Sequence, residues 1–153
     1  MIQTLLFFLQ GVPEIAGIVA CSLALARVRL RWGIILSFAC ILAVVIYIIR
    51  NMPVTFGLHT VISILLCALF VTKFTKVPPS TSFTVVFAGY AILALLEVTM
   101  HELFSSLLHT EVSQLISDDY IWKLIGFPHA IFMIAIALAI AKYKKPLESM
   151  WRV

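Results

Sequence analysis

The sequence comprises 153 residues, of which 63% are hydrophobic and 12% are charged, and its formal net charge at pH 7 is +4. A soluble domain carries roughly 25% charged residues, so this composition excludes a soluble globular protein and indicates an integral membrane protein. The basic residues lie at the ends of apolar runs, as topology signals do, which argues against a nucleic-acid partner. The lipid bilayer is therefore the first partner that the sequence implies.

Five apolar runs follow one another along the chain and leave no room for a separate soluble module. In lipid, a single segment can satisfy its own backbone hydrogen bonds only as a helix. We therefore expect an all-α fold, an integral membrane helical bundle of five transmembrane helices over residues 1–143, followed by a cytoplasmic tail over residues 144–153. The expected spans are residues 3–26, 33–49, 54–72, 82–104 and 120–142.

Short polar segments separate the runs. Arg50-Asn51-Met52-Pro53 turns the chain between the second and third spans, and Pro78-Pro79 follows the third, because proline cannot extend a helix from within. Residues 109–119 are the most polar segment and the candidate soluble loop before the last span.

The Lys and Arg residues near these segments predict the orientation. Two of them, Arg50 and Lys123, fall on one side of the membrane and the other nine on the opposite side. Because cytoplasmic segments carry an excess of Lys and Arg, we expect the N-terminus outside and the C-terminus in the cytoplasm. The nine are Arg27, Arg29, Arg31, Lys73, Lys76, Lys142, Lys144, Lys145 and Arg152.

Most ionisable residues within or beside the spans are expected near the outer face. Such residues normally face protein or water, because exposing a charge to lipid costs about 2.5 to 3.5 kcal/mol on insertion scales. Glu97 and His101 are four residues apart and so share one face of a helix. The candidate ligand-binding or polar cluster consists of Glu14, Arg50, His59, Glu97, His101 and His129.

Three interpretations of this cluster stay open. The first is a set of structural salt bridges formed by Glu14, Arg50, Glu97 and Lys123, with Arg50 expected to pair with one of the two glutamates. The second is an outward-facing pocket for a ligand or peptide. The third is a metal or proton site that combines the three histidines with the two glutamates, since imidazole and carboxylate suit zinc or iron, although no short motif such as HExxH supports it. No particular cofactor follows from the sequence.

Several short motifs between residues 12 and 140 carry a resemblance. They are Pro13-Glu14, Ile49-Arg50-Asn51-Met52-Pro53, Gly57-Leu58-His59-Thr60, Leu96-Glu97 and Gly126-Phe127-Pro128-His129. In these motifs the chain resembles the amino-terminal membrane region of bacterial sensor histidine kinases of the peptide-sensing and sporulation type. Such kinases continue into a dimerisation helix with a phospho-accepting histidine and an ATP-binding domain, which these 153 residues do not contain.

We therefore expect a non-enzymatic sensory or accessory domain in the bacterial cytoplasmic membrane. It would carry an outward-facing polar pocket and would signal to, or scaffold, a partner, as a homo-oligomer or with a larger membrane protein. The absence of GxSxG, P-loop and GxGxxG motifs agrees with a chain that is not an enzyme. One alternative is a small transporter or channel subunit for protons, cations or a small solute. Another is a structural subunit of a larger membrane complex.

Overall fold

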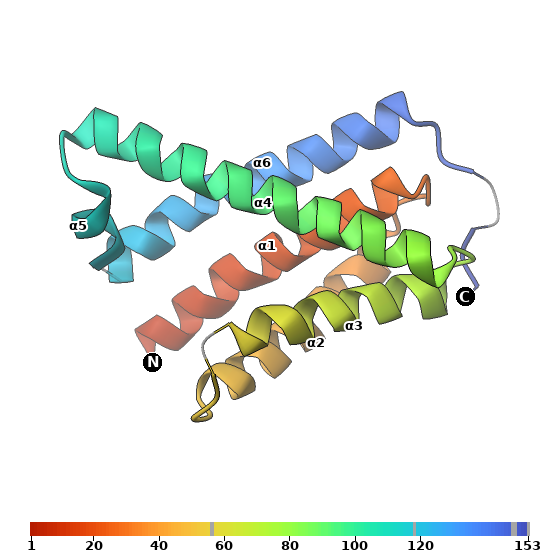
Figure 1. Ribbon diagram of the computed structural model, residues 1–153, viewed down its shortest axis with the longest axis horizontal. Coiled ribbons are helices and arrows are strands. Elements are labelled where there is room, and N and C mark those ends of the chain that lie inside the picture. The colour runs from red at the N-terminus through yellow and green to blue at the C-terminus, as the bar shows by residue number, and fades with distance from the viewer. Residues whose placement is uncertain (56, 118, 148–149, 153) are drawn as a thin grey trace.

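The computed structural model describes residues 1–55, 57–117, 119–147 and 150–152. In this part of the chain the backbone forms six helices, and its β-structure is limited to two isolated bridges (Figure 1). The all-α architecture expected from the apolar runs is therefore confirmed. The helices are α1 Ile2–Leu25, α2 Trp32–Arg50, α3 Leu58–Phe74, α4 Pro79–Leu108, α5 Val112–Ser117 and α6 Asp119–Tyr143.

Four helical segments are long and apolar enough to cross a membrane, namely α1, α2, α4 and residues Gly126–Tyr143 of α6. α3 is apolar but has only 17 residues. At about 1.5 Å per residue it is about 26 Å long, slightly shorter than a hydrocarbon core of about 30 Å. Length and composition thus support four spans directly, and α3 approaches the same length.

The largest differences from the expected boundaries are at α3, at α4 and in the segment between α4 and α6. α3 begins at Leu58 instead of residue 54, because Gly57 has a left-handed backbone, with φ of 89°, which cannot be part of a right-handed helix. α4 begins at Pro79, since proline is well suited to the first helical position, and it continues to Leu108. The segment expected as a soluble loop contains the short helix α5.

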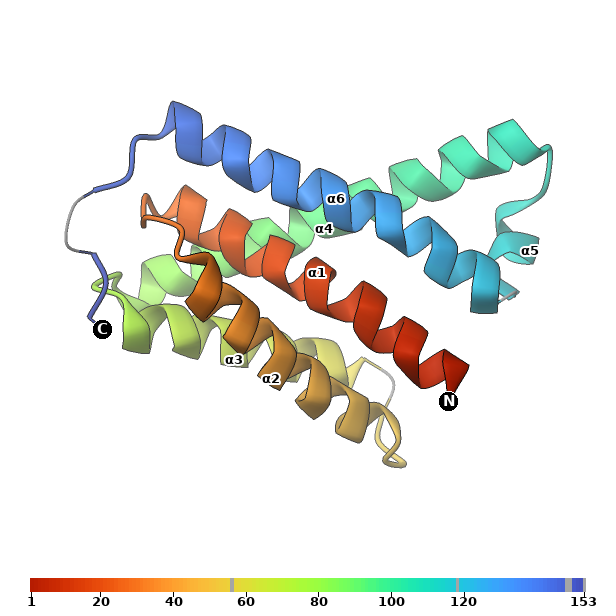
Figure 2. The same ribbon diagram turned by 180° about the vertical axis from the view of Figure 1, so that it is seen from behind.

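α1 occupies the centre of the bundle. It runs between α6 and α2, while α4 crosses over it on the side away from the viewer in Figure 2. Its residues from Ile15 to Ala24 are all buried. α3 packs against α4 and α2, so that α1 contacts three neighbouring helices and α3 closes the remaining side.

Two glycines allow the helices to approach α1 closely. A Cβ atom added to Gly17 of α1 would lie 2.8 Å from the Cβ of Met133 on α6. A Cβ added to Gly89 of α4 would lie 2.9 Å from the Oγ of Ser22 on α1. Helices within lipid associate largely through such packing of small residues. α6 and α4 therefore reach their observed distances from α1 only because neither glycine has a side chain.

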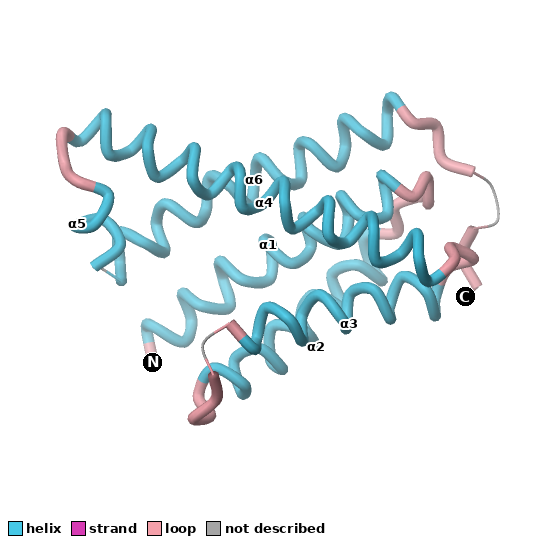
Figure 3. Tube along the Cα trace, in the orientation of Figure 1, coloured by secondary structure: helices cyan, strands magenta, loops and turns pink. Residues whose placement is uncertain are grey.

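The connecting segments gather at the two ends of the bundle (Figure 3). One end carries the N-terminus, the α2–α3 turn and α5, and the other carries the α1–α2 turn, the α3–α4 turn and the C-terminal residues (Figure 1). The nine basic residues named above belong to the second end, and Arg50 and Lys123 belong to the first. We call these the basic end and the N-terminal end.

The C-terminal tail, residues 144–152 where the structure describes them, is hydrogen-bonded to both turns of the basic end. The backbone N–H of Leu147 donates to the carbonyl of Arg27 at 2.9 Å. The N–H of Arg152 donates to the carbonyl of Phe74 at 2.9 Å, and the N–H of Lys76 donates to the carbonyl of Met150 at 2.8 Å. The tail thus connects the end of α6 to the α1–α2 and α3–α4 turns.

Replacing Gly17 by Ala tests the close approach of α1 and α6. We expect Gly17→Ala to destabilise the bundle by about 1 to 3 kcal/mol, because the added methyl group would force Met133 and the α6 backbone outward. Gly11→Ala is the matched control on the same helix, since nothing lies within 4 Å of its Cβ position. The free energy of unfolding in mild detergent measures both; equal values for the two variants would contradict the close packing.

Candidate functional site

A carboxylate and an imidazole lie close together between α1 and α6. The Nε2 atom of His129 lies 3.5 Å from the Oε2 atom of Glu14. The His129 side chain is 5% exposed and the Glu14 side chain 27% exposed, so the pair is largely removed from the surface. Glu14 lies half-way along α1.

α4 brings Glu97 and His101 near the Glu14–His129 pair. Glu97 lies close enough to Glu14, His129 and His101 for their charges to interact with it. His101 is 6% exposed, and its Nδ1 atom is 2.6 Å from the backbone carbonyl of Glu97, one turn earlier on the helix. The four side chains of Glu14, Glu97, His101 and His129 are called the buried polar cluster below.

Gln10 borders this cluster although the sequence did not mark it as a site residue. It is one turn before Glu14 on α1, and its side chain lies against Gly126 of α6, where a Cβ atom would overlap it. Gly126 is three residues before His129, so both contacts belong to the same face of α6. The i, i+4 spacing of Gln10 and Glu14 in an apolar run is the signal that could have identified this residue.

A second polar group between α3 and α4 was also missed. The hydroxyl groups of Ser63 and Tyr90 are hydrogen-bonded to each other, and the Cys67 side chain lies near both. Tyr90 lies within electrostatic range of Glu14, so this group adjoins the buried polar cluster. Ser63 and Cys67 are four residues apart on α3, but single small polar residues in an apolar run are common, so no pattern in the sequence distinguishes them.

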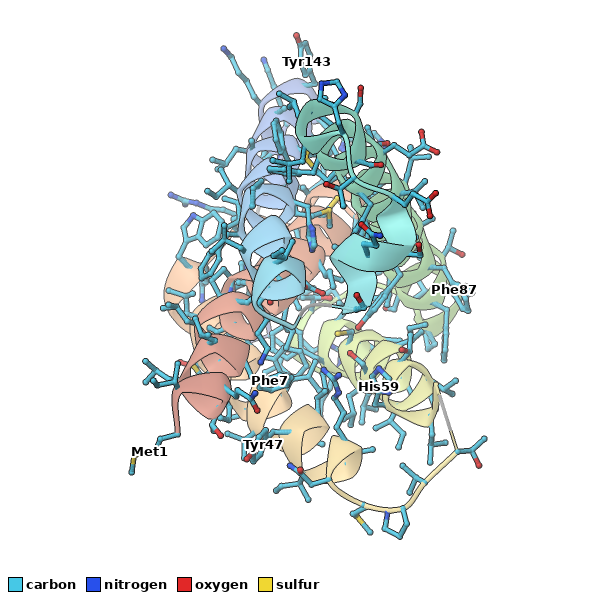
Figure 4. The ribbon with its side chains drawn as sticks, turned by 90° about the vertical axis from the view of Figure 1, so that its left-hand side faces the viewer. Met1, Phe7, Tyr47, His59, Phe87 and Tyr143 are labelled. Carbon is cyan, nitrogen blue, oxygen red and sulfur yellow. The ribbon has the colours of Figure 1, made fainter. Side chains whose placement is uncertain are left out.

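Arg50, the last residue of α2, and His59, the second residue of α3, lie at the N-terminal end. His59 is labelled in Figure 4. The guanidinium carbon of Arg50 is 5.5 Å from the centroid of the Phe7 ring, which in turn is 5.5 Å from the Tyr47 ring. His59 lies within electrostatic range of Arg50. Arg50 therefore makes a cation–π contact where the sequence predicted a carboxylate partner.

The depth of Arg50 explains this difference. Arg50 ends α2 at the level of Phe7, and Phe7 precedes Glu14 by seven residues, which is about 10 Å along a helix. Lys123 also has a partner other than a glutamate, since its Nζ atom donates a hydrogen bond to the backbone carbonyl of Gln3 at 3.4 Å. The cations named as salt-bridge partners thus lie at the N-terminal end, and Glu14 pairs with an imidazole deeper in the bundle.

The cluster combines two carboxylates with two imidazoles, which can exchange protons or hold a cationic or hydrogen-bonding ligand. The buried Nδ1 atom of His129 has no hydrogen-bond partner among the described residues. In that part of the chain, no three His, Cys, Asp or Glu side chains lie close enough to hold a metal ion. The metal or proton site considered from the sequence also included His59, which lies at the N-terminal end, apart from the other four residues.

Comparison with known proteins found no relative of this chain. No family model matches the sequence, and neither a curated protein nor a solved structure matches it.

A double-mutant cycle tests the Glu14–His129 pair. We expect Glu14→Gln and His129→Gln to couple by about 0.5 to 2 kcal/mol in the free energy of unfolding, because polar pairs between membrane helices contribute amounts of this order. Arg50→Ala combined with Glu14→Gln should instead be additive within about 0.5 kcal/mol, since the two residues do not share a partner. Additivity in the first cycle, or coupling in the second, would contradict the arrangement described here.

Proposed function

We propose that the chain is a non-enzymatic integral membrane domain of the bacterial cytoplasmic membrane that senses a ligand or protons at the buried polar cluster and signals through its basic end. The observation that carries this proposal is the path of α6. This helix holds His129 in the cluster and continues directly into the tail, which is hydrogen-bonded to both turns of the basic end. A change at the cluster can therefore act on the face that a cytoplasmic partner would contact.

The distribution of side chains supports insertion into a membrane. Large apolar residues are exposed along the outer faces of the helices, for example Ile41 of α2 at 64%, Leu95 of α4 at 70% and Ile131 of α6 at 67%. The ionisable groups Glu14 and His129 lie between the helices instead. Apolar residues outside and charged residues inside form the pattern that a hydrocarbon solvent requires.

The proposed orientation is supported by the excess of Lys and Arg at the basic end, and labelling tests it. We expect a cysteine introduced at the exposed Ser113 to react with a membrane-impermeant maleimide in intact cells, because the N-terminal end should face outward. Lys144→Cys at the basic end should react only after permeabilisation. The unsubstituted chain, whose three cysteines lie in apolar helices, is the control. The reverse labelling pattern would contradict the orientation.

Hydrogen exchange tests the connection between cluster and tail. We expect Glu14→Gln to raise exchange of the Leu147 and Arg152 amides by about tenfold, because weakening the contact of α6 with α1 would loosen the tail that α6 carries. Glu102→Gln is the control, since Glu102 is exposed on α4 outside the cluster. Unchanged exchange at these two amides, with altered exchange near Glu14, would show that the cluster does not communicate with the basic end.

A transporter of protons or cations is a second candidate, because carboxylates and imidazoles inside a membrane bundle also form proton pathways. Proteoliposomes that enclose a pH-sensitive dye separate the two functions. A transporter should carry protons down an imposed gradient and should lose this flux in Glu14→Gln. A sensory domain should leave the flux equal to that of empty liposomes.

A further inference from the structure

A shallow apolar groove lies on the outer surface of the α2–α3 pair, toward the basic end. Its volume is about 200 Å³. The floor contains Phe38 of α2 stacked on Phe70 of α3, with ring centroids 4.1 Å apart and planes inclined by 19°. The lining residues are Phe38, Leu66, Leu69, Phe70, Lys73 and Phe74.

The only charged residue in this lining is Lys73, which is exposed in the last turn of α3. Leu66 precedes Lys73 by seven residues, so the apolar part of the groove extends about 10 Å along the helix from the ammonium group. A groove with a cation at one end and apolar residues along its length is complementary to a phospholipid. The phosphate of a phospholipid lies at the membrane surface, and its acyl chains extend into the hydrocarbon core.

The charges around the groove favour an anionic ligand. The sequence contains no Asp or Glu between residues 15 and 96, while the same stretch contains four Arg and two Lys. The α2–α3 hairpin and both of its flanking turns therefore have positive charge without a carboxylate of their own. Arg152 of the tail adds a further cation beside the groove, because its Nε atom donates to the carbonyl of Thr75 at 2.8 Å.

We propose that this groove binds one anionic phospholipid, with the phosphate against Lys73 and an acyl chain along Leu66, Leu69 and Phe70. Each Lys or Arg near an anionic membrane surface contributes attraction that is worth about a fivefold change in affinity. This inference rests on the membrane insertion in the proposed function and is independent of sensing at the buried polar cluster. The groove is lined by residues of α2 and α3, and neither helix contributes a residue to the buried polar cluster.

Native mass spectrometry of the delipidated protein tests the site. The protein in mild detergent receives equal amounts of phosphatidylglycerol and phosphatidylcholine with the same acyl chains. We expect the first bound lipid to be phosphatidylglycerol, and Lys73→Gln to lower this preference about fivefold. Leu69→Trp should lower total occupancy of the first site, because Leu69 is 59% exposed at the groove and a larger side chain would fill it without changing the charge.

Lys142→Gln is the matched control, since Lys142 is also exposed in the last turn of a helix at the basic end but lies outside the groove. Equal effects of Lys142→Gln and Lys73→Gln would overturn the site and show diffuse attraction to the basic end. Loss of a homodimer in Leu69→Trp, with unchanged lipid binding, would identify the groove as a protein interface and overturn the proposal. Carbonate extraction of the membranes from which the protein is purified tests membrane insertion separately. A protein that resists extraction but shows no preference for phosphatidylglycerol would contradict this inference alone.

Discussion

The position of α1 depends on close contact with α6 and α4, which Gly17 and Gly89 permit. Helices that are already surrounded by lipid gain little from burying apolar surface against each other, so close packing and polar contacts decide how they associate. At these two glycines the backbones come near enough for side chains on either side to meet. Glu14 lies three residues before Gly17 on α1, and His129 lies four residues before Met133 on α6, so the pair is within about one turn of the close contact between Gly17 and Met133. The close packing and the polar contact therefore involve the same stretch of α1 and α6.

The identity of the partner of Glu14 changes what the cluster can do. A guanidinium is always charged, so an Arg50–Glu14 pair would have been a permanent salt bridge. An imidazole can be charged or neutral, and each state presents a different set of donors and acceptors to Glu14 and Glu97. A bundle that holds a buried imidazole against a half-buried carboxylate therefore has a contact whose strength depends on the charge of the imidazole.

The sequence predicted the elements better than the contacts between them. Apolar runs and flanking residues such as Pro79 define the helices, because length and hydrophobicity are local properties. Glu14 and His129 were both named as candidates, but their pairing depends on how far α1 and α6 are displaced along each other, which no local pattern reports. Arg50 was expected at the depth of a carboxylate and lies at the level of Phe7. Tyr90 was missed because an aromatic residue in an apolar run gives no sign that its hydroxyl has a partner.

The tail has a consequence for how the protein is assembled. Its hydrogen bonds join Arg27 and Leu147, and also Phe74 and Arg152, so they connect segments that lie far apart in the sequence. Until the residues that follow α6 are in place, the two turns of the basic end have no tail to hold them together, and helix packing alone fixes their separation. Helix packing and the tail therefore contribute separately, and in that order, to the final form of this end.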